Sequence, residues 1–437
     1  MNQNKIKLII ASNIMHIGGA ERTVQTLALN LNKEIFDVTI LCLEDGGGRV
    51  DELLRNGAKV LIGNGTIGKI KELIPSPAVD ILHFHRSGHK ENLHIEVLEY
   101  LAPKKAMETN VFAFDDDILG SKFDLRIYKS MMMLTQRAWK ERIINKDWWK
   151  KERVIYNPVT LDKFNIYKLD EKSIQEKRQS LGINNHDIVI GRVGRNDPVK
   201  WGDLILTALP YIKKELPNVK IIFKTAPVNR LKWLKKKGYL GTNVIVLSET
   251  NDEKEISETY QLMDIYAHTT RRGEAFGNTL NEAMAWRLPI IVENTPHWDN
   301  GQLEQVENNV NGFVVQSVGG FLAALKRLTG NKVERIQFGL NGRKKVEENF
   351  DQDIGIGQYE LSYKHLMGMI SEIDLQKNIF PSMKEVELYA REYENLKRID
   401  YPHQSSMSVE FKFLKDKLKW RLYDSLIARG FIEKPQI

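Results

Sequence analysis

The sequence predicts an α/β protein built from two parallel-sheet domains in tandem. Short apolar runs alternate with amphipathic helical segments along most of the chain, which is typical of parallel strands connected by helices. The 437 residues exceed one ordinary domain, and 42% of them are hydrophobic, enough for two cores. A loop, a helix and a buried strand at 271–292 have the features of a phosphate-binding segment.

The first domain is predicted over residues 1–165. A strand at 5–12 leads into a loop with Gly18 and Gly19, and a helix at 20–31 follows. Strand, glycine-rich turn and helix is how dinucleotide-binding folds hold phosphates, although a tight turn also needs small residues. Further strands are expected at 38–43, 59–62, 81–85 and 105–109.

Two histidines lie near the end of the strand at 81–85. His83 and His85 point to the same side of a strand because side chains alternate. Such a pair can bind a metal, but no cysteine or carboxylate cluster lies nearby in the sequence. We therefore predict no metal site at this strand end.

The second domain is predicted over residues 166–350. Arg195 and Lys200 follow its first strand and precede a helix that starts near Asp203. Two cations beside a helix N-terminus would neutralise a diphosphate, and the alternative is a pair of solvent-exposed loop cations. Strands are expected at 187–193, 219–224, 244–247, 265–268, 288–292 and 312–315.

The segment 271–289 is predicted to be the centre of the site. The backbone amides of Phe276, Gly277 and Asn278 would lie at the open N-terminus of a helix over 279–286, where an anion binds well. Glu274 and Glu282 flank that point, about 12 Å apart at helical rise. They would accept hydrogen bonds from the two ends of a sugar nucleotide, or simply be solvated glutamates.

Composition restricts the partners and the compartment. The net charge of +7 and pI of about 9.0 favour acidic partners such as nucleotide diphosphates and anionic membrane surfaces. No nucleic-acid recognition module is present. Cys42 lies in an apolar run, and a single cysteine forms no disulfide within the chain. With no apolar run of about 20 residues, we expect a cytoplasmic protein, with peripheral association at the inner membrane surface allowed.

Two basic segments interspersed with apolar residues allow that association. Trp139, Trp148 and Trp149 are mixed with basic residues, which suits a membrane interface or a core helix whose lysines reach solvent. Residues 411–420 are similarly basic and would lie on an anionic membrane or pack as an amphipathic helix.

An ordered set of motifs resembles family 4 of the retaining glycosyltransferases. Glu274 and Glu282 match the family's glutamate–seven–glutamate motif, and the resemblance covers residues 5–370. The other matching motifs, in chain order, are Gly18–Arg22, Val154–Val159, Gly191–Arg195 with Lys200, and Asn311–Val315.

The resemblance implies the B-type architecture, in which two Rossmann-like domains face a central cleft. Residues 351–373 would form a helix that crosses back to the first domain, and residues 374–437 would form a basic helical tail. It implies transfer of a hexose-type sugar from a UDP- or GDP-sugar to a glycan or lipid-linked glycan. Configuration would be retained, with no metal and no cofactor.

The resemblance also implies roles for single residues. Glu274, Arg195 and Lys200 would be catalytic. Donor contacts would come from Gly18, Gly19, Phe276, Gly277, Asn278, Thr279, Glu282, Ser248 and Thr225. His85 and Arg86 would line the acceptor or sugar pocket. Asn110 stands where many relatives carry a histidine that contacts the donor sugar.

Three alternatives stay open. Asp115, Asp116 and Asp117 resemble the metal-binding carboxylates of the other large glycosyltransferase fold, so a metal-dependent transferase is one hypothesis. A sugar-nucleotide epimerase or a phosphorylase would use the same architecture. A non-catalytic carbohydrate- or membrane-binding protein is the third, and Asn110 is the feature that favours it.

Overall fold

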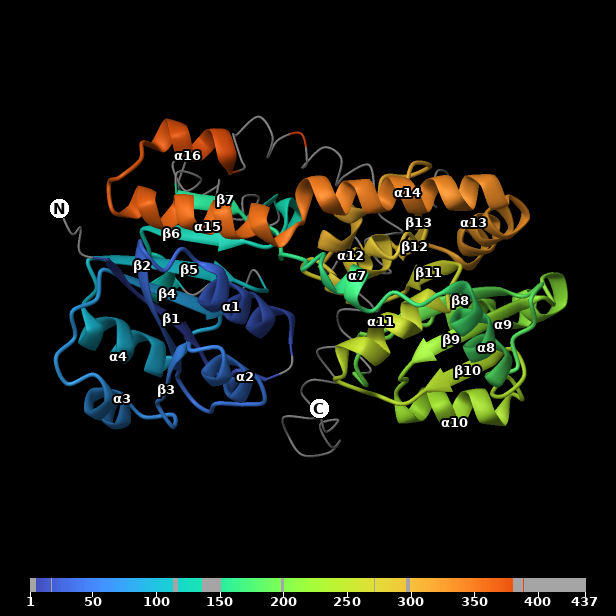
Figure 1. The fold of residues 1–437 in the computed structure, drawn as a ribbon, viewed down its shortest axis with the longest axis horizontal. Coiled ribbons are helices and arrows are strands. Elements are labelled where there is room, and N and C mark those ends of the chain that lie inside the picture. Colours follow the sequence, from blue (N-terminus) through green and yellow to red (C-terminus); the bar gives the residue numbers. More distant parts are fainter. Residues whose placement is uncertain are drawn as a thin grey trace. The chain divides into compact units, whose positions relative to one another are not determined.

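The computed structural model describes residues 5–16, 18–112, 117–135, 151–197, 200–270, 272–295, 299–379 and 388. The chain divides into two compact units, each built on its own sheet (Figure 1). Among the described residues, the first unit comprises those of Met1–Asp162 and Ala275–Asn281 and those from Lys345 onward, and the second comprises those of Lys163–Glu274 and Glu282–Lys344.

The first unit holds a seven-stranded parallel sheet in the order β3-β2-β1-β4-β5-β6-β7. The five predicted strands are present, with boundaries shifted by no more than a few residues. The strands are β1 (Ile6–Ser12), β2 (Phe36–Cys42), β3 (Lys59–Ile62), β4 (Ile81–Arg86), β5 (Lys105–Asn110), β6 (Leu125–Tyr128) and β7 (Glu152–Val154).

Strands β6 and β7 were not predicted, because their charged residues hide the apolar pattern. Arg126 of β6 and Glu152 of β7 are buried, and their side chains approach each other to 3.4 Å. Arg126 also donates a 2.8 Å hydrogen bond to the buried Glu108 of β5. A buried charge is tolerated when it is paired, and only the folded structure reveals the pairing.

Helices cover both faces of this sheet. Leu8 and Ile10 face a core shared with α1 (Gly19–Asn30), α2 (Val50–Arg55), α15 (Gln352–Leu366) and α16 (Glu372–Asn378). Ile9 and Ala11 face the opposite core, with α3 (Ile67–Leu73) and α4 (Asn92–Leu101). This alternation explains why the strands are apolar on both sides. Cys42, which lies in an apolar run of the sequence, is buried in the first core.

The second unit holds a six-stranded parallel sheet in the order β10-β9-β8-β11-β12-β13. All six predicted strands are confirmed. The order reverses between β8 and β11, which makes their carboxyl ends the switch point where ligands bind in open α/β sheets. The strands are β8 (Ile188–Val193), β9 (Val219–Lys224), β10 (Val244–Leu247), β11 (Ile265–His268), β12 (Ile290–Glu293) and β13 (Gly312–Val315).

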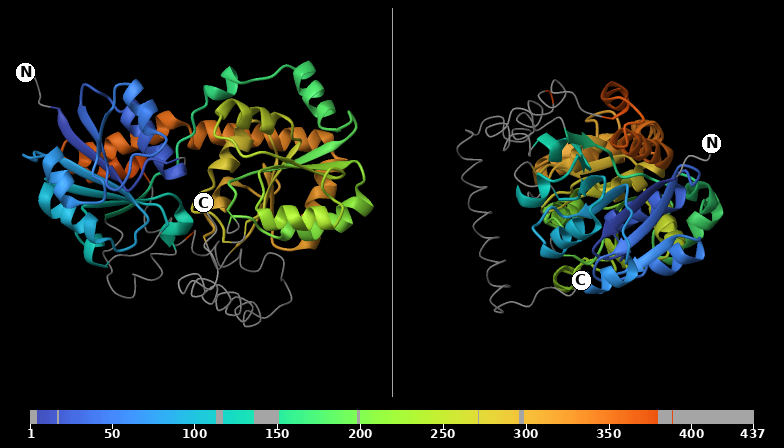
Figure 2. Two further views of the ribbon diagram at one scale, coloured as in Figure 1. Left: turned by 90° about the horizontal axis from the view of Figure 1, so that it is seen from below. Right: turned by 90° about the vertical axis from the view of Figure 1, so that its left-hand side faces the viewer.

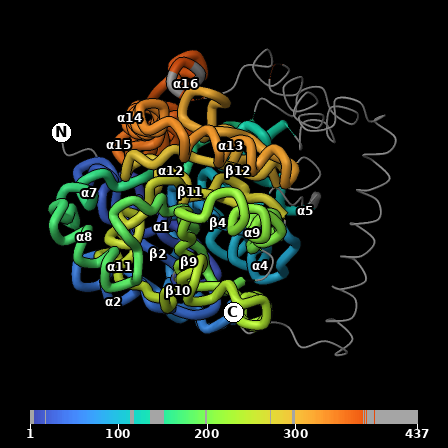
Figure 3. The backbone as a smooth tube through the Cα atoms, turned by 90° about the vertical axis from the view of Figure 1, so that its right-hand side faces the viewer, coloured from blue at the N-terminus to red at the C-terminus, as the bar shows by residue number. Residues whose placement is uncertain are grey.

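Helices α9 (Leu204–Glu215), α10 (Val228–Lys236) and α13 (Val318–Gly330) pack on one core of this unit. Figure 2 shows helices on both faces of the sheet, and Figure 3 shows α13 beside α9, against which it packs. The other helices among the described residues are α5 (Asp117–Gly120), α7 (Lys163–Ile166), α8 (Glu171–Ser180), α11 (Glu253–Gln261), α12 (Asn278–Ala285), α14 (Lys332–Asn349) and the 3-10 helix η2 (Gly301–Gln305).

Several predicted features lie outside the described residues. They are Arg271, Asp115 and Asp116, the tryptophan-rich segment from Trp139 to Trp149, and most of the predicted tail, including 411–420. Within the described ranges, no helix has the length and apolar character needed to cross a membrane.

Candidate functional site

The carboxyl edge of the second sheet holds an ion pair at its switch point. Lys200 lies in the loop after β8, and Glu274 lies in the loop after β11. The Lys200 Nζ is 2.6 Å from the Glu274 Oε2, and the two side chains are 24% and 19% exposed. The structure therefore brings together two residues that the sequence predicted separately, and it leaves both within reach of solvent.

The backbone of Glu274 is fixed by the segment that begins at Asn300. The Glu274 amide donates a 2.9 Å hydrogen bond to Gln302 Oε1, and its carbonyl accepts a 2.9 Å bond from the Gly301 amide. The preceding Gly273 has a φ of +67°, and a Cβ placed there would lie 1.5 Å from the Asp299 carbonyl oxygen. Only glycine allows the two loops to approach this closely.

The electrostatics of the pair favour a charged Glu274. Burial by itself would raise the pKa of this carboxyl, but nearby positive charge, chiefly that of the Lys200 ammonium, outweighs that effect, and the net pKa is lowered. The buried His268 lies with its Nε2 3.7 Å from Glu274 Oε1. Burial, followed by the charge of Arg192, lowers the pKa of His268 to about 3, so its imidazole is neutral near pH 7.

Arg192 holds the loop that carries Lys200. Its guanidinium is buried, donates a 3.0 Å hydrogen bond to the Thr269 carbonyl, and also bonds the Lys200 carbonyl. The guanidinium carbon lies 4.3 Å from the centre of the Trp201 ring. Arg192 lies inside the predicted Gly191–Arg195 motif, but no role was predicted for it. Arg192 can anchor the loop only because β8 and β11 are neighbours in the folded sheet, which places the Thr269 carbonyl within its reach.

Arg195 is placed differently from Lys200. Its side chain is exposed, and its carbonyl accepts a 3.0 Å hydrogen bond from Trp201 Nε1. In the described part of the chain, its guanidinium takes part in no ion pair. The predicted partnership with Lys200 on a diphosphate therefore stays a prediction.

Glu282 is held by the second unit. Its Oε2 accepts a 2.9 Å hydrogen bond from the Tyr260 hydroxyl, and its Oε1 lies 3.2 Å from Lys163 Nζ. Only 8% of the residue is exposed. Thr225 and Ser248 follow β9 and β10 at the same carboxyl edge, and Thr225 has a φ of +60°.

Asp299 also belongs to this site and was not predicted from the sequence. Burial, together with the nearby charge of Glu274, raises its pKa to about 6, against the opposing effect of Lys200. No sequence motif marks Asp299. It reaches the site because its backbone lies against Gly273.

In the first unit, the predicted Gly19 and Asn278 meet. A Cβ on Gly19 would lie 2.5 Å from Asn278 Nδ2, and Asn278 Oδ1 accepts a 2.9 Å hydrogen bond from Asn157. Asn157 in turn lies 3.3 Å from the Thr23 hydroxyl. Gly18 and Gly19 open α1, and Thr279 follows Asn278 in α12.

The segment from Phe276 to Asn278 is anchored by aromatic packing. Phe276 stacks on Tyr156 with ring centres 5.2 Å apart, and Phe350 packs edge-on against both rings. Gly277 has a φ of +98°, a conformation that glycine adopts most readily. Helix α12 begins at Asn278, one residue before the predicted start.

The carboxyl ends of β4 and β5 form a buried polar cluster in the first unit. His83 and His85 share one side of β4, as predicted, with ring centres 4.4 Å apart. His83 bonds Tyr363 and Thr109, each at 2.8 Å, and Lys129 donates a 2.7 Å bond to Tyr359.

The three residues predicted to line the acceptor pocket are brought close together but are buried. His85, Arg86 and Asn110 are 4%, 3% and 0% exposed, and Arg86 pairs with Asn110 in the register of the sheet. Arg86 donates to Glu108 at 2.8 Å and to His94 at 3.2 Å. Their contact with a substrate therefore stays a prediction.

The described residues contain no cluster of three or more His, Cys, Asp or Glu with the geometry for a metal ion. Asp115 and Asp116 are not among them, and Asp117 begins α5.

Comparisons with known proteins agree with the predicted resemblance. Residues 173–345 match the family model described as glycosyl transferases group 1, and this segment contains Arg195, Lys200, Glu274 and Glu282. The chain is 26% identical over 212 residues to spore coat protein SA of Bacillus subtilis, covering 46% of this chain and 55% of that one. It is 28% identical over 207 residues to the capsular polysaccharide biosynthesis glycosyltransferase CapM of Staphylococcus aureus, covering 46% and 51%. The chain thus spans about half the length of the curated relatives it matches.

Solved structures share the fold. A glycosyltransferase from Rickettsia africae superposes with a TM-score of 0.68 at 19% identity, covering 84% of this chain and 99% of its own. HepE from Anabaena, solved with UDP, superposes with a TM-score of 0.67 at 18% identity, covering 82% and 100%. The predicted architecture of two Rossmann-like parallel-sheet units is confirmed.

Proposed function

We propose that this protein is a glycosyltransferase that uses a nucleotide-diphosphate sugar as donor. The observation that carries the proposal is the Lys200–Glu274 pair at the switch point of the second sheet, inside the segment that matches the family model. A cation beside a carboxylate, both partly exposed, suits a ligand that has a diphosphate at one end and sugar hydroxyls at the other.

The donor is proposed to be a UDP- or GDP-sugar, with a uridine nucleotide to be tested first. HepE, which shares the fold, has been solved with UDP and with UDP-glucose. Lys200 and Arg195 would neutralise the charge that develops on the leaving diphosphate. Glu282, oriented by Tyr260 and Lys163, would accept a hydrogen bond from the ribose.

Glu274 is proposed to bind the hydroxyls of a hexose-type sugar. Its lowered pKa keeps it ionised, and the ion pair with Lys200 makes it a hydrogen-bond acceptor in preference to a nucleophile. Transfer would then retain configuration without a covalent intermediate on Glu274, with a leaving phosphate oxygen taking the proton of the acceptor hydroxyl. No metal is needed for these steps, since Lys200 and Arg195 supply the positive charge.

The acceptor is proposed to be a glycan or a lipid-linked glycan. The name of CapM places that relative in capsular polysaccharide biosynthesis, which supports polysaccharide biosynthesis as the setting. Association with an anionic membrane would bring the enzyme to a lipid-linked acceptor.

The test is a thermal-shift series with UDP, GDP, ADP and their sugar conjugates, with and without EDTA. A ligand that binds the folded state raises the melting temperature by mass action. We expect one nucleotide to stabilise the wild type regardless of EDTA, and Lys200→Ala to lose the shift. Lys172→Ala, an exposed lysine of α8, is the control that keeps it.

Two outcomes would contradict the proposal. A shift that requires metal and survives Lys200→Ala would place the donor at Asp115–Asp117. The absence of a shift with every nucleotide would favour a non-catalytic binding protein. Retention is tested separately, by determining the anomeric configuration of the product by NMR.

A further inference from the structure

The positive charge of the chain is concentrated in one stretch of the second unit. Residues 204–248 contain nine Lys and Arg residues and a single acidic residue, Glu215. This stretch therefore carries a charge of +8, whereas the whole chain carries +7, so the remaining residues together are almost neutral. Such concentration calls for a local explanation.

Six lysines of this stretch lie exposed on α9, on α10 and directly after α10. We call them the lysine face: Lys213, Lys214, Lys232, Lys235, Lys236 and Lys237. None of the six takes part in an ion pair with any residue that the structure describes. In contrast, Lys224 and Arg230 of the same stretch pair with Glu255 and Asp203.

The lysine face is continuous. Lys232, Lys235 and Lys236 share the outer side of α10, because Leu231 and Leu234 pack against the core. Trp233 stacks on Tyr239 with ring centres 5.8 Å apart, and Lys213 Nζ of α9 lies 5.8 Å from the same Tyr239 ring. The ends of the two helices are therefore neighbours, and Figure 1 shows α10 alongside β10 at the margin of the unit.

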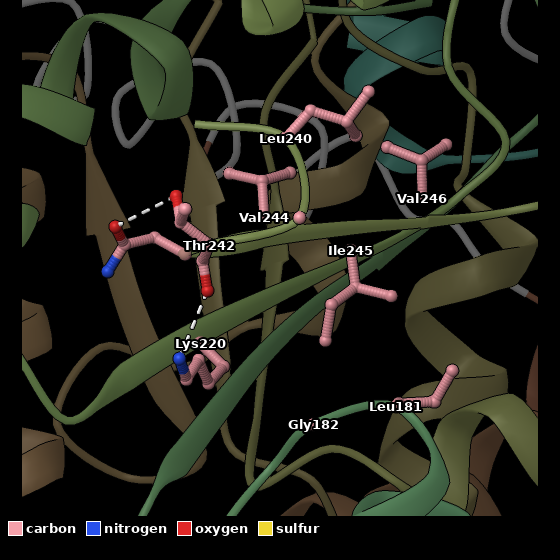
Figure 4. A pocket seen from close by; sticks show the side chains of 10 residues that line it. Leu181, Gly182, Lys220, Leu240, Thr242, Val244, Ile245 and Val246 are labelled. Atoms are coloured by element: carbon pink, nitrogen blue, oxygen red, sulfur yellow. Dashed lines mark hydrogen bonds between the residues drawn. The ribbon is translucent and has the colours of Figure 1, made fainter. Parts of the chain in front are cut away.

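Apolar side chains accompany the lysines. Tyr211 and Leu240 are 49% and 38% exposed. Leu240 also borders a hollow of about 630 Å³ beside the edge strand β10, together with Val244 and Val246 (Figure 4). Lys220 lies in the same hollow, with its Nζ donating a 3.0 Å hydrogen bond to the Thr242 carbonyl. The surface thus offers cations around a small apolar area.

This surface lies at the edge of the sheet opposite the candidate site. Helices α9 and α10 end just before β9 and β10 begin, so the lysine face lies at the amino ends of these strands. Lys200, Glu274, Thr225 and Ser248 all follow carboxyl ends. The lysine face is therefore separate from the residues proposed to bind the donor.

We propose that the lysine face docks on an anionic phospholipid bilayer. The unpaired cations are all lysines, which act as compact point charges that attract a diffuse negative surface, whereas arginine suits bidentate recognition of single phosphates. Leu240 and Tyr211 would enter the headgroup region, where amphipathic and apolar side chains bind. The inference deepens the proposed membrane association by naming its surface, and it needs no transferase activity.

The experiment is co-sedimentation of the full chain with vesicles of phosphatidylcholine, with or without phosphatidylglycerol. We expect binding only to the anionic vesicles, weakening as sodium chloride rises. The variant Lys232→Glu/Lys235→Glu/Lys236→Glu should lose at least about tenfold in affinity, because each lysine near such a surface contributes severalfold. The control Lys5→Glu/Lys33→Glu/Lys332→Glu makes the same charge change at exposed positions elsewhere and should keep most of the binding.

A second variant distinguishes a bilayer from a soluble polyanion. Leu240→Ser should weaken binding to anionic vesicles while leaving binding to dextran sulfate unchanged. Equal loss with both triple variants would show that only net charge matters and would overturn the proposal. Full vesicle binding by the α10 triple variant would also overturn it. So would a Leu240→Ser variant that binds dextran sulfate more weakly but binds anionic vesicles as the wild type does. Circular dichroism and an unchanged nucleotide thermal shift show that each variant is folded and that the donor site is unaffected.

Discussion

The Nζ of Lys200 lies 2.6 Å from Oε2 of Glu274, although 74 residues separate them in the chain. Arg192 holds the loop of one, and Gly273 with Gln302 holds the loop of the other. Because both groups stay partly exposed, a ligand can separate them. The ammonium then binds the phosphates of the ligand, and the carboxylate accepts hydrogen bonds from its hydroxyls.

This pair predicts opposite effects of two substitutions on nucleotide binding. Lys200→Ala should weaken binding of the nucleoside diphosphate by about tenfold or more, because it removes a charge-assisted contact. Glu274→Gln should leave that binding unchanged or tighter, because Lys200 no longer has a competing partner, yet it should weaken binding of the sugar conjugate. Isothermal titration calorimetry measures both. Equal losses in the two variants would contradict the assigned roles.

Asp299 predicts a pH-dependent change in stability. Its pKa is raised from 3.8 to about 6, so its contribution to stability is present below pH 3.8 and is lost as the pH rises through 6. Asp299→Asn should therefore match the wild type below pH 4 and exceed it by about 1–3 kcal/mol above pH 7. Thermal unfolding across this range measures the difference. A stability difference between Asp299→Asn and the wild type that does not change with pH would contradict a raised pKa of Asp299.

The buried amine of Lys129 also predicts a pH-dependent change in stability, in this case a loss of stability as the pH falls. Burial lowers its pKa from 10.5 to about 7, so its stabilising contribution is present above pH 10.5 and is lost as the pH falls through 7. Lys129→Met should be more stable than the wild type by roughly 2–4 kcal/mol at pH 7, and the gap should close toward pH 10. The Tyr359 hydroxyl, which loses its bond from Lys129 in this variant, still has the Thr109 hydroxyl as a hydrogen-bond partner 3.2 Å away. A less stable variant at pH 7 would contradict the prediction.

Gly273 and Gly238 form a matched pair for testing the loop that carries Glu274. Both have positive φ, +67° and +69°, but a Cβ at Gly238 meets no atom within 4 Å. Gly238→Ala should cost about 1–2 kcal/mol from backbone strain alone. Gly273→Ala adds the collision with the Asp299 carbonyl and should cost more than about 4 kcal/mol or prevent folding. Similar melting temperatures for the two variants would show that the two loops are not tightly packed.

The sequence showed most of the architecture because alternating apolar runs report directly on buried parallel strands. It failed at β6 and β7, where Arg126 and Glu152 are buried as an ion pair and interrupt the apolar pattern. It proposed Lys200, Glu274 and Glu282 as site residues by residue type and order, but it assigned no role to Arg192 and did not mark Asp299. It also could not show that His85, Arg86 and Asn110 are buried.

What the sequence determined by itself is therefore the order of strands and helices and the set of motifs, because these depend on local periodicity and residue type. Only the tertiary structure decided which charges meet. The strand order reverses between β8 and β11, and this reversal brings Lys200 to Glu274. Likewise, Asp299 reaches the site because its carbonyl lies against Gly273, where no side chain intervenes. Contacts between residues distant in the chain depend on topology and close packing, and neither is expressed in the local pattern of residues.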